Sequence, residues 1–424
     1  MKIKGFRWYI IVLIALGTAI NYLDRQGLPI AIGELRRNFT ISDMDFGLIN
    51  SLFLFAYGTM YAVGGRILDI FGTRKTYAIM VIWWSLANIL HSVVSSVLGL
   101  GIVRFLLGTG EGGSFPGSAK AISEWFPAKE RAFAFGIFNT GSSLGALVAP
   151  LLISSIIAGL SWRWAFIICG CFGLIWVIFW LQLYSIPSKS KFITSGEKDY
   201  LSDETGDLMV GRKTSIAWRS LFQYREVWGL LTIKFFSDAG WFFFIFWLPK
   251  YLYDVRGLDI KAVGTFAWIP YAFAGVGSFV GGWFSSYLLK KGHSLNFSRK
   301  LPLGISAALL PFSLLIANSS LTMAIVFFSL AMLGHQSWAT IVQTLAADLF
   351  PSGIVGTVAG LMGCVGTYGA MLFSLIAGGI VQNFGFGIAF IVAGLLHPLS
   401  FISIFLIMKK FKPVTLNIHH LSLK

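Results

Sequence analysis

Long apolar runs separated by short polar segments make up most of this 424-residue chain. Most runs reach the length of about 20 residues that a helix needs to cross a hydrocarbon core about 30 Å thick. They are continuous, unlike the alternating strands of a membrane barrel, and helices satisfy their own backbone in lipid. The pattern therefore predicts an all-α membrane protein with twelve transmembrane helices. The predicted spans are 8–31, 44–68, 76–94, 97–118, 131–158, 163–184, 228–252, 262–289, 300–318, 321–346, 354–381 and 386–408.

The longest polar stretch lies between the sixth and seventh spans and divides the chain into halves. The segments "WFPAKERAFAFGIFNTGSSLG" and "LFPSGIVGTVAGLMGCVGTYG" match at one fixed offset, which pairs Phe126 with Phe350 and Gly145 with Gly369. Such internal repeats are typical of transporters, so we expect two pseudo-symmetric six-helix bundles. The predicted parts are an N-terminal bundle, a cytoplasmic central loop, a C-terminal bundle and a cytoplasmic tail, at residues 1–184, 185–227, 228–411 and 412–424.

Composition supports the membrane prediction, and the charge distribution gives the orientation. The chain is 56% hydrophobic and 12% charged, whereas soluble domains carry about 25% charged residues. Of its 33 Lys and Arg, 23 lie in the termini and even-numbered loops and six on the opposite side. This asymmetry predicts a multi-pass plasma-membrane protein (the inner membrane if the source is bacterial) with both termini in the cytoplasm. The net charge of +15 is therefore a topology signal, and no nucleic-acid partner is expected.

The chain lacks the usual signatures of enzymes and ATP-driven pumps. Its three cysteines all fall within predicted spans and have neither disulfide-framework nor metal-ligand spacing. No G-x-x-x-x-G-K-[ST] loop and no catalytic triad spacing occurs. The basic start lacks a convincing cleavage site, which favours an uncleaved first span. We expect no enzyme activity, no metal and no cofactor other than a coupling proton.

Six charged residues lie deep in apolar segments, three acids and three bases: Asp24, Arg25, Arg104, Glu111, Lys234 and Asp238. Each costs roughly 2.5–3.5 kcal/mol on insertion scales when it lies at a helix centre. They are therefore expected to face a partner or a water-filled cavity. The balance of signs is consistent with either arrangement.

The spacing of these charges suggests how they meet. Arg104 and Glu111 are seven residues apart, so they share one helix face. Asp24 and Arg25 are consecutive in "NYLDRQ" and point about 100° apart. One arrangement places Asp24 against Arg104 and turns Arg25 toward the cavity or Glu111.

An adjacent acid and base on a cavity-lining helix offer a proton site beside an anion site. An anion that binds the base reduces the electrostatic stabilisation that the base gives to the ionised acid, and so favours protonation of the acid. We therefore assign Asp24 and Glu111 to proton coupling, and Arg25 and Arg104 to substrate binding. The structural alternative is a charge network that only ties helices together.

Further polar and aromatic residues suit a site of sugar size. Lys234 and Asp238 are four apart, either part of that site or a self-satisfied structural pair. Aromatic rings can stack on a sugar's apolar face and amides can bond its hydroxyls, although packing alone would also explain each residue. His335 takes the repeat-related position of Glu111 and is either a second titrating group or a packed histidine. The other substrate-binding candidates are Tyr57, Asn139, Ser142, Trp241, Gln336 and Gln343.

The loop between the second and third spans is a candidate gate. Its segment "GRILDIFGTRK" resembles the loop signature of the major facilitator superfamily, and "GWFSSYLLKKGHSLNFSRK" repeats it in the second half without the acid. Glycines permit a tight turn, and an acid can meet a helix N-terminus or a base. An ordinary cationic loop that fixes topology is the alternative. The predicted gating residues are Gly65, Asp69, Gly72, Arg74, Lys75 and, in the next loop on that side, Arg131.

Four segments carry a resemblance over nearly the full length: "KIKGFRWY", "NYLDRQ", "GEGGSFPGSAKAISEWFPAKERAFAFGIFNTGSSLGA" and "KFFSDAGWFFFIFWLPKYL". They resemble the anion:cation symporter family of the major facilitator superfamily, and within it the bacterial hexuronate transporters. The resemblance implies proton-coupled uptake of organic anions by alternating access. It places Asp24 and Glu111 on proton-coupling carboxylates, Arg25 and Arg104 on partner arginines, and Tyr57 on a substrate-site tyrosine.

The resemblance is more specific in the second half. The pattern of Lys234, Asp238 and Trp241 is similar to the hexuronate branch, and Gly363 stands where galactonate-type members carry a polar residue. We therefore predict a monomeric, proton-coupled hexuronate symporter that takes a small organic anion. If both coupling acids load protons, one positive charge enters with each monoanion. An exchanger of organic anions or sugar phosphates, and a non-transporting sensor of the same fold, remain as alternatives.

Overall fold

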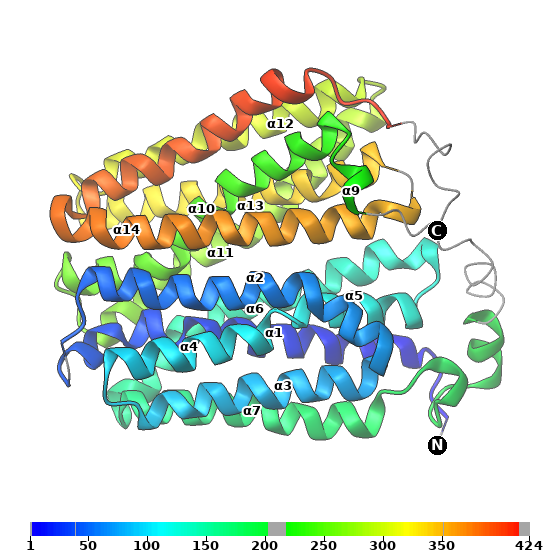
Figure 1. Cartoon of the computed structure of the whole chain (residues 1–424), viewed down its shortest axis with the longest axis horizontal. Helices are drawn as coiled ribbons and strands as arrows, with labels where there is room; N and C mark the ends of the chain where they lie inside the picture. The colour runs from blue at the N-terminus through cyan, green and yellow to red at the C-terminus, as the bar shows by residue number, and fades with distance from the viewer. Residues whose placement is uncertain (1, 39, 202–217, 351, 415–424) are drawn as a thin grey trace. The chain divides into compact units, whose positions relative to one another are not determined.

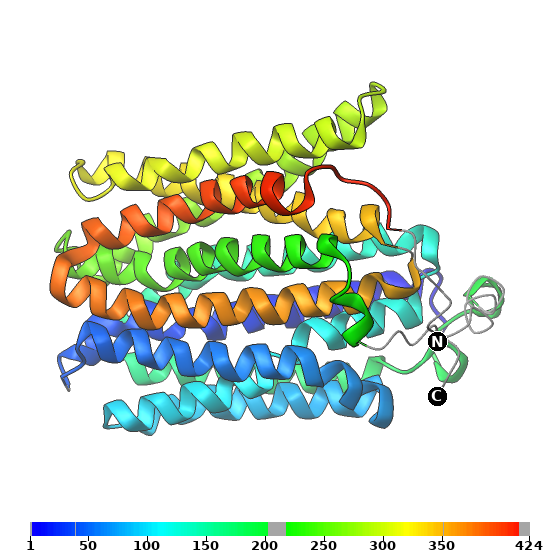
Figure 2. The same cartoon turned by 45° about the horizontal axis from the view of Figure 1, so that its top comes forward.

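The computed structural model describes residues 2–38, 40–201, 218–350 and 352–414. Regular structure in these ranges is helical, apart from an isolated bridge between Ile3 and Ile193. Figure 1 labels the helices along the chain, and Figure 2 gives a second view. The helices of the first half are α1 (Phe6–Arg36), α2 (Asp43–Phe71), α3 (Thr73–Leu90), η1 (His91–Val93), α4 (Val97–Glu111), α5 (Ser114–Trp125), α6 (Ala128–Gly159) and α7 (Trp162–Leu183). Those that follow are η2 (Pro187–Lys189), α9 (Trp218–Leu221), α10 (Arg225–Asp254), α11 (Ile260–Lys290), α12 (Leu295–Leu309), η3 (Leu310–Leu315), α13 (Leu321–Leu349), α14 (Ser352–Ser403) and η4 (Ile404–Met408).

Nine helices of the described part are long and apolar enough to cross a membrane. The last of them runs through Gly385, whose φ of 78° marks the kink between the predicted spans 354–381 and 386–408. Figure 1 shows the chain reversing direction there. These helices account for ten of the twelve predicted spans, and the all-α prediction is confirmed.

The other two predicted spans are interrupted helices. Span 97–118 was predicted as one helix, and the structure divides it into α4 and α5 at Gly112 and Gly113. Glycine is a poor helix former, so two in succession weaken the helix there. Span 300–318 becomes α12 followed by the 3-10 turn η3, which carries Pro311. Proline has no N–H to donate to the preceding turn, which accounts for the end of the regular helix.

The internal repeat is visible in the helix starts. The first residues of α4 and α13 are separated by the same number of positions as the repeated segments of the sequence. The first residues of α6 and α14 are separated by that number too. The caps repeat as well, because Ser96 accepts a hydrogen bond from the Gly99 amide and Ser320 accepts one from the Met323 amide. Serine at the N-cap satisfies an amide that the helix leaves without a partner. The offset seen in the sequence therefore corresponds to equivalent helices.

The described contacts divide the chain into two compact units. The first contains Met1–Arg212 with Ile245–Trp268, and the second contains Lys213–Phe244 with Ile269–Lys424. Residues 225–244 of α10 thus belong to the second unit, and the remaining stretch, Ile245–Asp254, packs in the first.

Glycines bring helices close together in equivalent places of both units. In the first unit, a Cβ at Gly145 of α6 would overlap the carbonyl of Ala19 on α1 and lie 2.9 Å from the Tyr22 Cβ. In the second, a Cβ at Gly369 of α14 would overlap the carbonyl of Phe235 on α10. Small residues permit this approach in membranes. The close contacts hold α1 and α10, which carry the predicted charges, against their neighbours.

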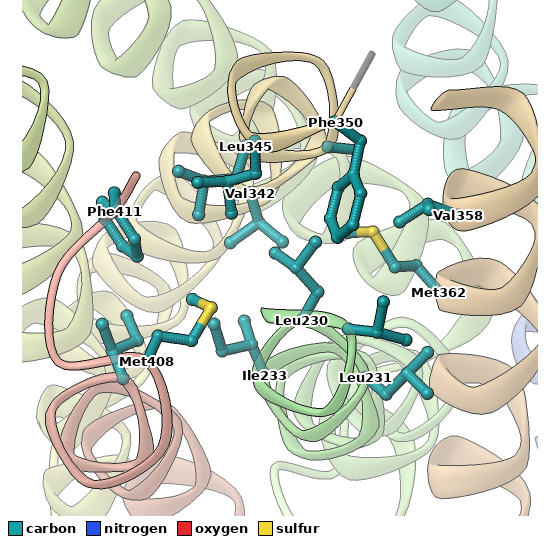
Figure 3. Packing of buried hydrophobic residues seen from close by; sticks show 14 of the residues in the cluster. Leu230, Leu231, Ile233, Val342, Leu345, Phe350, Val358, Met362, Met408 and Phe411 are labelled. Carbon is teal, nitrogen blue, oxygen red and sulfur yellow. The ribbon is translucent and has the colours of Figure 1, made fainter. Parts of the chain in front are cut away.

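The second unit has a continuous apolar core. Figure 3 shows side chains from α10, α13, α14, η4 and the segment after η4 converging. All are buried, and many are Leu, Ile or Val. The labelled members are Leu230, Leu231, Ile233, Val342, Leu345, Phe350, Val358, Met362, Met408 and Phe411.

Candidate functional site

A buried ion pair joins α1 to α4 in the first unit. Arg25 donates from Nε to Oε2 of Glu111 at 3.0 Å, and Nη2 lies 3.0 Å from the same oxygen. Nη2 also donates to Oδ1 of Asn21 at 3.0 Å. Arg25 is 2% exposed and Glu111 is 0% exposed. Removing either partner alone would leave an uncompensated buried charge, which is strongly destabilising.

Aromatic rings surround the Arg25 guanidinium. Its Cζ lies 4.7 Å from the ring centroids of both Tyr22 and Tyr57, and 5.6 Å from that of Phe53. A guanidinium over an aromatic face is stabilised by the ring quadrupole, most strongly when it is desolvated. Of these rings, the sequence predicted only Tyr57. Tyr22 stands three residues before Arg25 in "NYLDRQ", a spacing that places both on one helix face.

Arg104 binds a backbone carbonyl that a proline has left without its helical donor. Both of its Nη atoms donate to the carbonyl oxygen of Arg25 at 3.2 Å. In a regular helix the amide of residue 29 would bond this oxygen, but Pro29 has no N–H. Arg104 is fully buried. The expected pairing of Asp24 with Arg104 is therefore replaced by a contact between Arg104 and the α1 backbone.

Asp24 is held by a neutral amide from α3. Its Oδ1 accepts a hydrogen bond from Nδ2 of Asn88 at 2.8 Å, and the same amide nitrogen donates to the carbonyl of Phe166 at 3.2 Å. Asp24 and Asn88 are both 1% exposed. The two predicted coupling acids thus differ, because Glu111 is paired with a cation and Asp24 with an amide. Asn88 was not among the predicted site residues.

The charged pair of the second unit is also formed. Lys234 Nζ lies 2.7 Å from Asp238 Oδ1, one turn along α10. Gly366 of α14 makes room for the pair, because a Cβ there would overlap the Asp238 carboxylate. The side chains are 14% and 12% exposed, so the pair is less buried than Arg25 and Glu111.

One turn further along α10, Trp241 stacks on His335. Their ring centroids are 4.5 Å apart and their planes differ by 9°. His335 Nδ1 lies 2.9 Å from Nε2 of His397, a buried residue on α14 that the sequence analysis missed. A histidine within the apolar segment "AGLLHPLS" was an available signal.

Four other substrate-binding candidates lie apart from these contacts. Asn139 and Gln343 are exposed, and Ser142 and Gln336 are half-buried. Ser142 donates from Oγ to the carbonyl of Asn139 at 2.7 Å. In the described ranges, the structure brings none of the four into a hydrogen bond with the charged residues.

The predicted gating loop forms a tight turn. Gly72 ends α2 and precedes α3 with a φ of 82°, which L side chains rarely adopt. Arg74 donates to the carbonyl of Leu181 on α7, and Trp180 donates from Nε1 to the Arg74 carbonyl at 2.9 Å. Lys75 is exposed and Gly65 is half-buried. The side chains of Asp69 and Arg131 lie outside the described residues.

The repeat-related turn has a direct ion pair. Gly292 has a φ of 85°, and Arg299 donates from Nε to Oδ2 of Asp348 on α13 at 2.7 Å. Asp348 is the repeat-related counterpart of Glu124, which accepts a hydrogen bond from Thr73 at 2.6 Å. Both acids were absent from the predicted gating set.

A second charge cluster in the first unit joins α1, α2 and the last part of α10, Ile245–Asp254. Lys250 is 0% exposed and pairs with Asp43 and Asp254. Arg36 bonds the same two acids, at 2.8 and 2.7 Å. Neither Lys250 nor Arg36 was among the predicted site residues, although Lys250 and Asp254 have the spacing of a helical ion pair. No group of three His, Cys, Asp or Glu is arranged as metal ligands in the part of the chain that the structure describes.

Comparisons with known proteins agree with the fold and the motifs. Residues 14–295, more than half of the chain, match the family described as Major Facilitator Superfamily. The "Hexuronate transporter" of Escherichia coli (strain K12) is 32% identical over 413 residues, which are 96% of this chain and 95% of that protein. The "Galacturonate transporter" of Dickeya chrysanthemi is 36% identical over 313 residues, 73% of this chain and 90% of that protein.

A solved structure supports the same fold. The crystal structure of a D-xylose-proton symporter superposes with a TM-score of 0.76 at 14% identity, covering 97% of this chain and all of that chain. With the twelve-span architecture, the internal repeat and the family match, these similarities identify a multi-pass membrane protein. The chain belongs to the major facilitator superfamily.

Proposed function

We propose that this protein is a symporter that carries a sugar-acid anion, most specifically a hexuronate, into the cytoplasm together with protons. The transporters of hexuronate and galacturonate that it resembles support the substrate class. The observation that carries the proposal is the buried Arg25. Its guanidinium contacts the Glu111 carboxylate and lies close to several aromatic side chains. A site built this way can hold a monoanionic sugar acid by charge and by ring contact.

Competition for Arg25 couples the proton to the anion. Glu111 and the carboxylate of the substrate both require the same guanidinium donors. When Glu111 takes up a proton, its attraction to Arg25 weakens and the substrate carboxylate can replace it. Loss of the proton reverses the exchange and favours release. Each half-step keeps one carboxylate beside the buried cation, which avoids the cost of an uncompensated charge.

Asp24 supplies a second acid of different character. It lies beside Arg25 in the chain but is bonded to the Asn88 amide, so it can change charge without breaking the Arg25–Glu111 pair. We assign both acids to proton coupling. We further propose that both termini lie in the cytoplasm, as the Lys and Arg distribution indicates, and that the protein works as a monomer.

The test is uptake of radiolabelled glucuronate into proteoliposomes, with and without an inward proton gradient. Wild-type protein is expected to accumulate glucuronate only with the gradient. The Glu111→Gln variant, which mimics the protonated acid, is expected to lose accumulation and retain counterflow exchange. Protein-free liposomes control for leakage.

Two results would refute the proposal. Accumulation driven by an anion gradient and indifferent to protons would indicate an exchanger. Binding of glucuronate without any flux, by protein whose fold is verified, would indicate a sensor.

A further inference from the structure

Two fully buried amides in the first unit have no hydrogen-bond partner among the described residues. Gln26 on α1 and Asn50 on α2 are both 0% exposed. The nitrogen and the oxygen of each side-chain amide are buried without a partner. A buried polar group left unsatisfied costs about 1–3 kcal/mol, and native proteins contain few of them. Four such atoms on two side chains call for an explanation.

The position of Asn50 places it beside the candidate anion site. Asn50 lies four residues after Phe46 and three before Phe53, so the three share one face of α2. The Phe53 ring lies 5.6 Å from the Arg25 guanidinium carbon. The ring centroids of Phe46 and Trp247 are 5.0 Å apart, and Trp247 belongs to the Ile245–Asp254 part of α10. Asn50 therefore lies on the face of α2 whose aromatic residues contact both the Arg25 site and this part of α10.

Helix geometry places Gln26 on the face of α1 that meets the same segment of α10. It follows Arg25 directly, and it precedes Gly33 by seven residues, which puts Gln26 and Gly33 on one helix face. A Cβ at Gly33 would overlap the ring of Tyr253, which also belongs to the Ile245–Asp254 part of α10. Helix geometry and these contacts place both buried amides where Ile245–Asp254 packs on α1 and α2 within the first unit.

Amides at these positions suit a hydroxylated ligand. A primary amide offers donors and an acceptor, and a hydroxyl group both donates and accepts, so each amide can bond neighbouring hydroxyls of a sugar. Arg25, next to Gln26 in the chain, supplies the charge for a carboxylate. A carboxylate beside a row of hydroxyls is the chemistry of a sugar acid, whereas an unsubstituted carboxylic acid would leave both amides unpaired.

We propose that Gln26 and Asn50 form the hydroxyl-binding subsite of the transporter and select polyhydroxylated anions over plain carboxylates. The inference rests on the proposed function and deepens it. In this structure Ile245–Asp254 of α10 covers the amides, so the ligand reaches them when that segment separates from α1 and α2. The competing occupant is water, which would satisfy the amides without conferring selectivity.

The test measures binding by calorimetry to the purified full-length protein with two probes, D-glucuronate and cyclohexanecarboxylate. The variants are Gln26→Met and Asn50→Leu, which keep size and remove the amide. Each is expected to weaken glucuronate binding about 5- to 20-fold, as expected for one or two lost hydrogen bonds, and to leave cyclohexanecarboxylate binding unchanged. If either variant fails to fold, the alanine variant at that position replaces it.

A stability measurement separates a ligand subsite from a structural role. Without ligand, Gln26→Met and Asn50→Leu are expected to keep or raise the unfolding temperature, because they remove unpaired buried groups. The matched control is Asn88→Leu, an equally buried amide with two hydrogen bonds, which is expected to lower it.

Three outcomes would overturn the inference. Unchanged glucuronate affinity in both variants would mean that the amides hold water only. Equal losses for both probes would indicate a general packing role. Absence of glucuronate binding to folded wild-type protein would overturn the proposed function itself, and the inference with it, which the wild-type arm reveals directly.

Discussion

Asn88 offers a direct test of how the buried acid Asp24 is held. Its amide nitrogen makes two hydrogen bonds, to Oδ1 of Asp24 at 2.8 Å and to the carbonyl of Phe166 at 3.2 Å. Leucine has nearly the same shape and no donor. Asn88→Leu is therefore expected to remove both bonds without leaving a large cavity, and to destabilise the protein.

The magnitude follows from the two acceptors. A hydrogen bond between neutral groups in a membrane protein contributes about 0.6 kcal/mol on average. A bond to an ionised carboxylate contributes about 1.5–3 kcal/mol. Asn88→Leu should therefore cost about 2–4 kcal/mol while Asp24 is ionised. The cost should fall toward about 1 kcal/mol in acid, because a protonated carboxyl accepts a weaker bond.

A double-mutant cycle with Asp24→Leu isolates the bond. Equilibrium unfolding of the purified proteins in mixed micelles, in alkaline and in acid buffer, gives the coupling energy under both conditions. We expect coupling of about 1.5–3 kcal/mol in alkaline buffer and a smaller value in acid. Coupling below about 0.5 kcal/mol in both buffers, the range of independent sites, would refute the reasoning.

Other predictions concern the turn, the second unit and the driving force. Gly72→Ala, at a φ of 82° with no neighbour near an added Cβ, should cost about 1–3 kcal/mol in equilibrium unfolding, while Gly136→Ala in an open helical position should not. Gly366→Ala should displace Asp238 and reduce glucuronate uptake, and Gly360→Ala on the same helix should leave uptake unchanged. With two protons per monoanion, the driving force for uptake should increase by about 2.3 kcal/mol per 100 mV of inside-negative potential. Uptake that does not change with a potential set by valinomycin would contradict this stoichiometry.

Several parts of the structure were predictable because they depend on local pattern. Apolar length located the spans, since lipid imposes helices of that length. The fixed offset between the repeated segments located the equivalent helices and their serine caps. The glycine of the gating turn was predictable because its backbone geometry excludes most side chains. Intramembrane charges located a candidate site because their insertion cost requires partners.

The partners themselves were decided by packing between helices. Arg25 was expected to face the cavity or Glu111, and it binds Glu111. Arg104, however, binds a carbonyl that Pro29 leaves open, not Asp24. The sequence contains Arg104 and Pro29, but nothing in their spacing shows that α4 approaches α1 at the carbonyl of Arg25.

The class of the protein, its repeat, and the residue types available for a candidate ion-coupled anion site could be predicted from the amino-acid sequence. These follow from hydrophobicity, spacing along one helix and the cost of burying charge, which act locally. The packing of the helices was needed to reveal that Asn88 bonds Asp24, that His397 lies beside His335, and that Gln26 and Asn50 are buried without partners among the described residues. Those contacts join helices far apart in the chain, and the angle and depth at which two helices pack depend on every side chain between them.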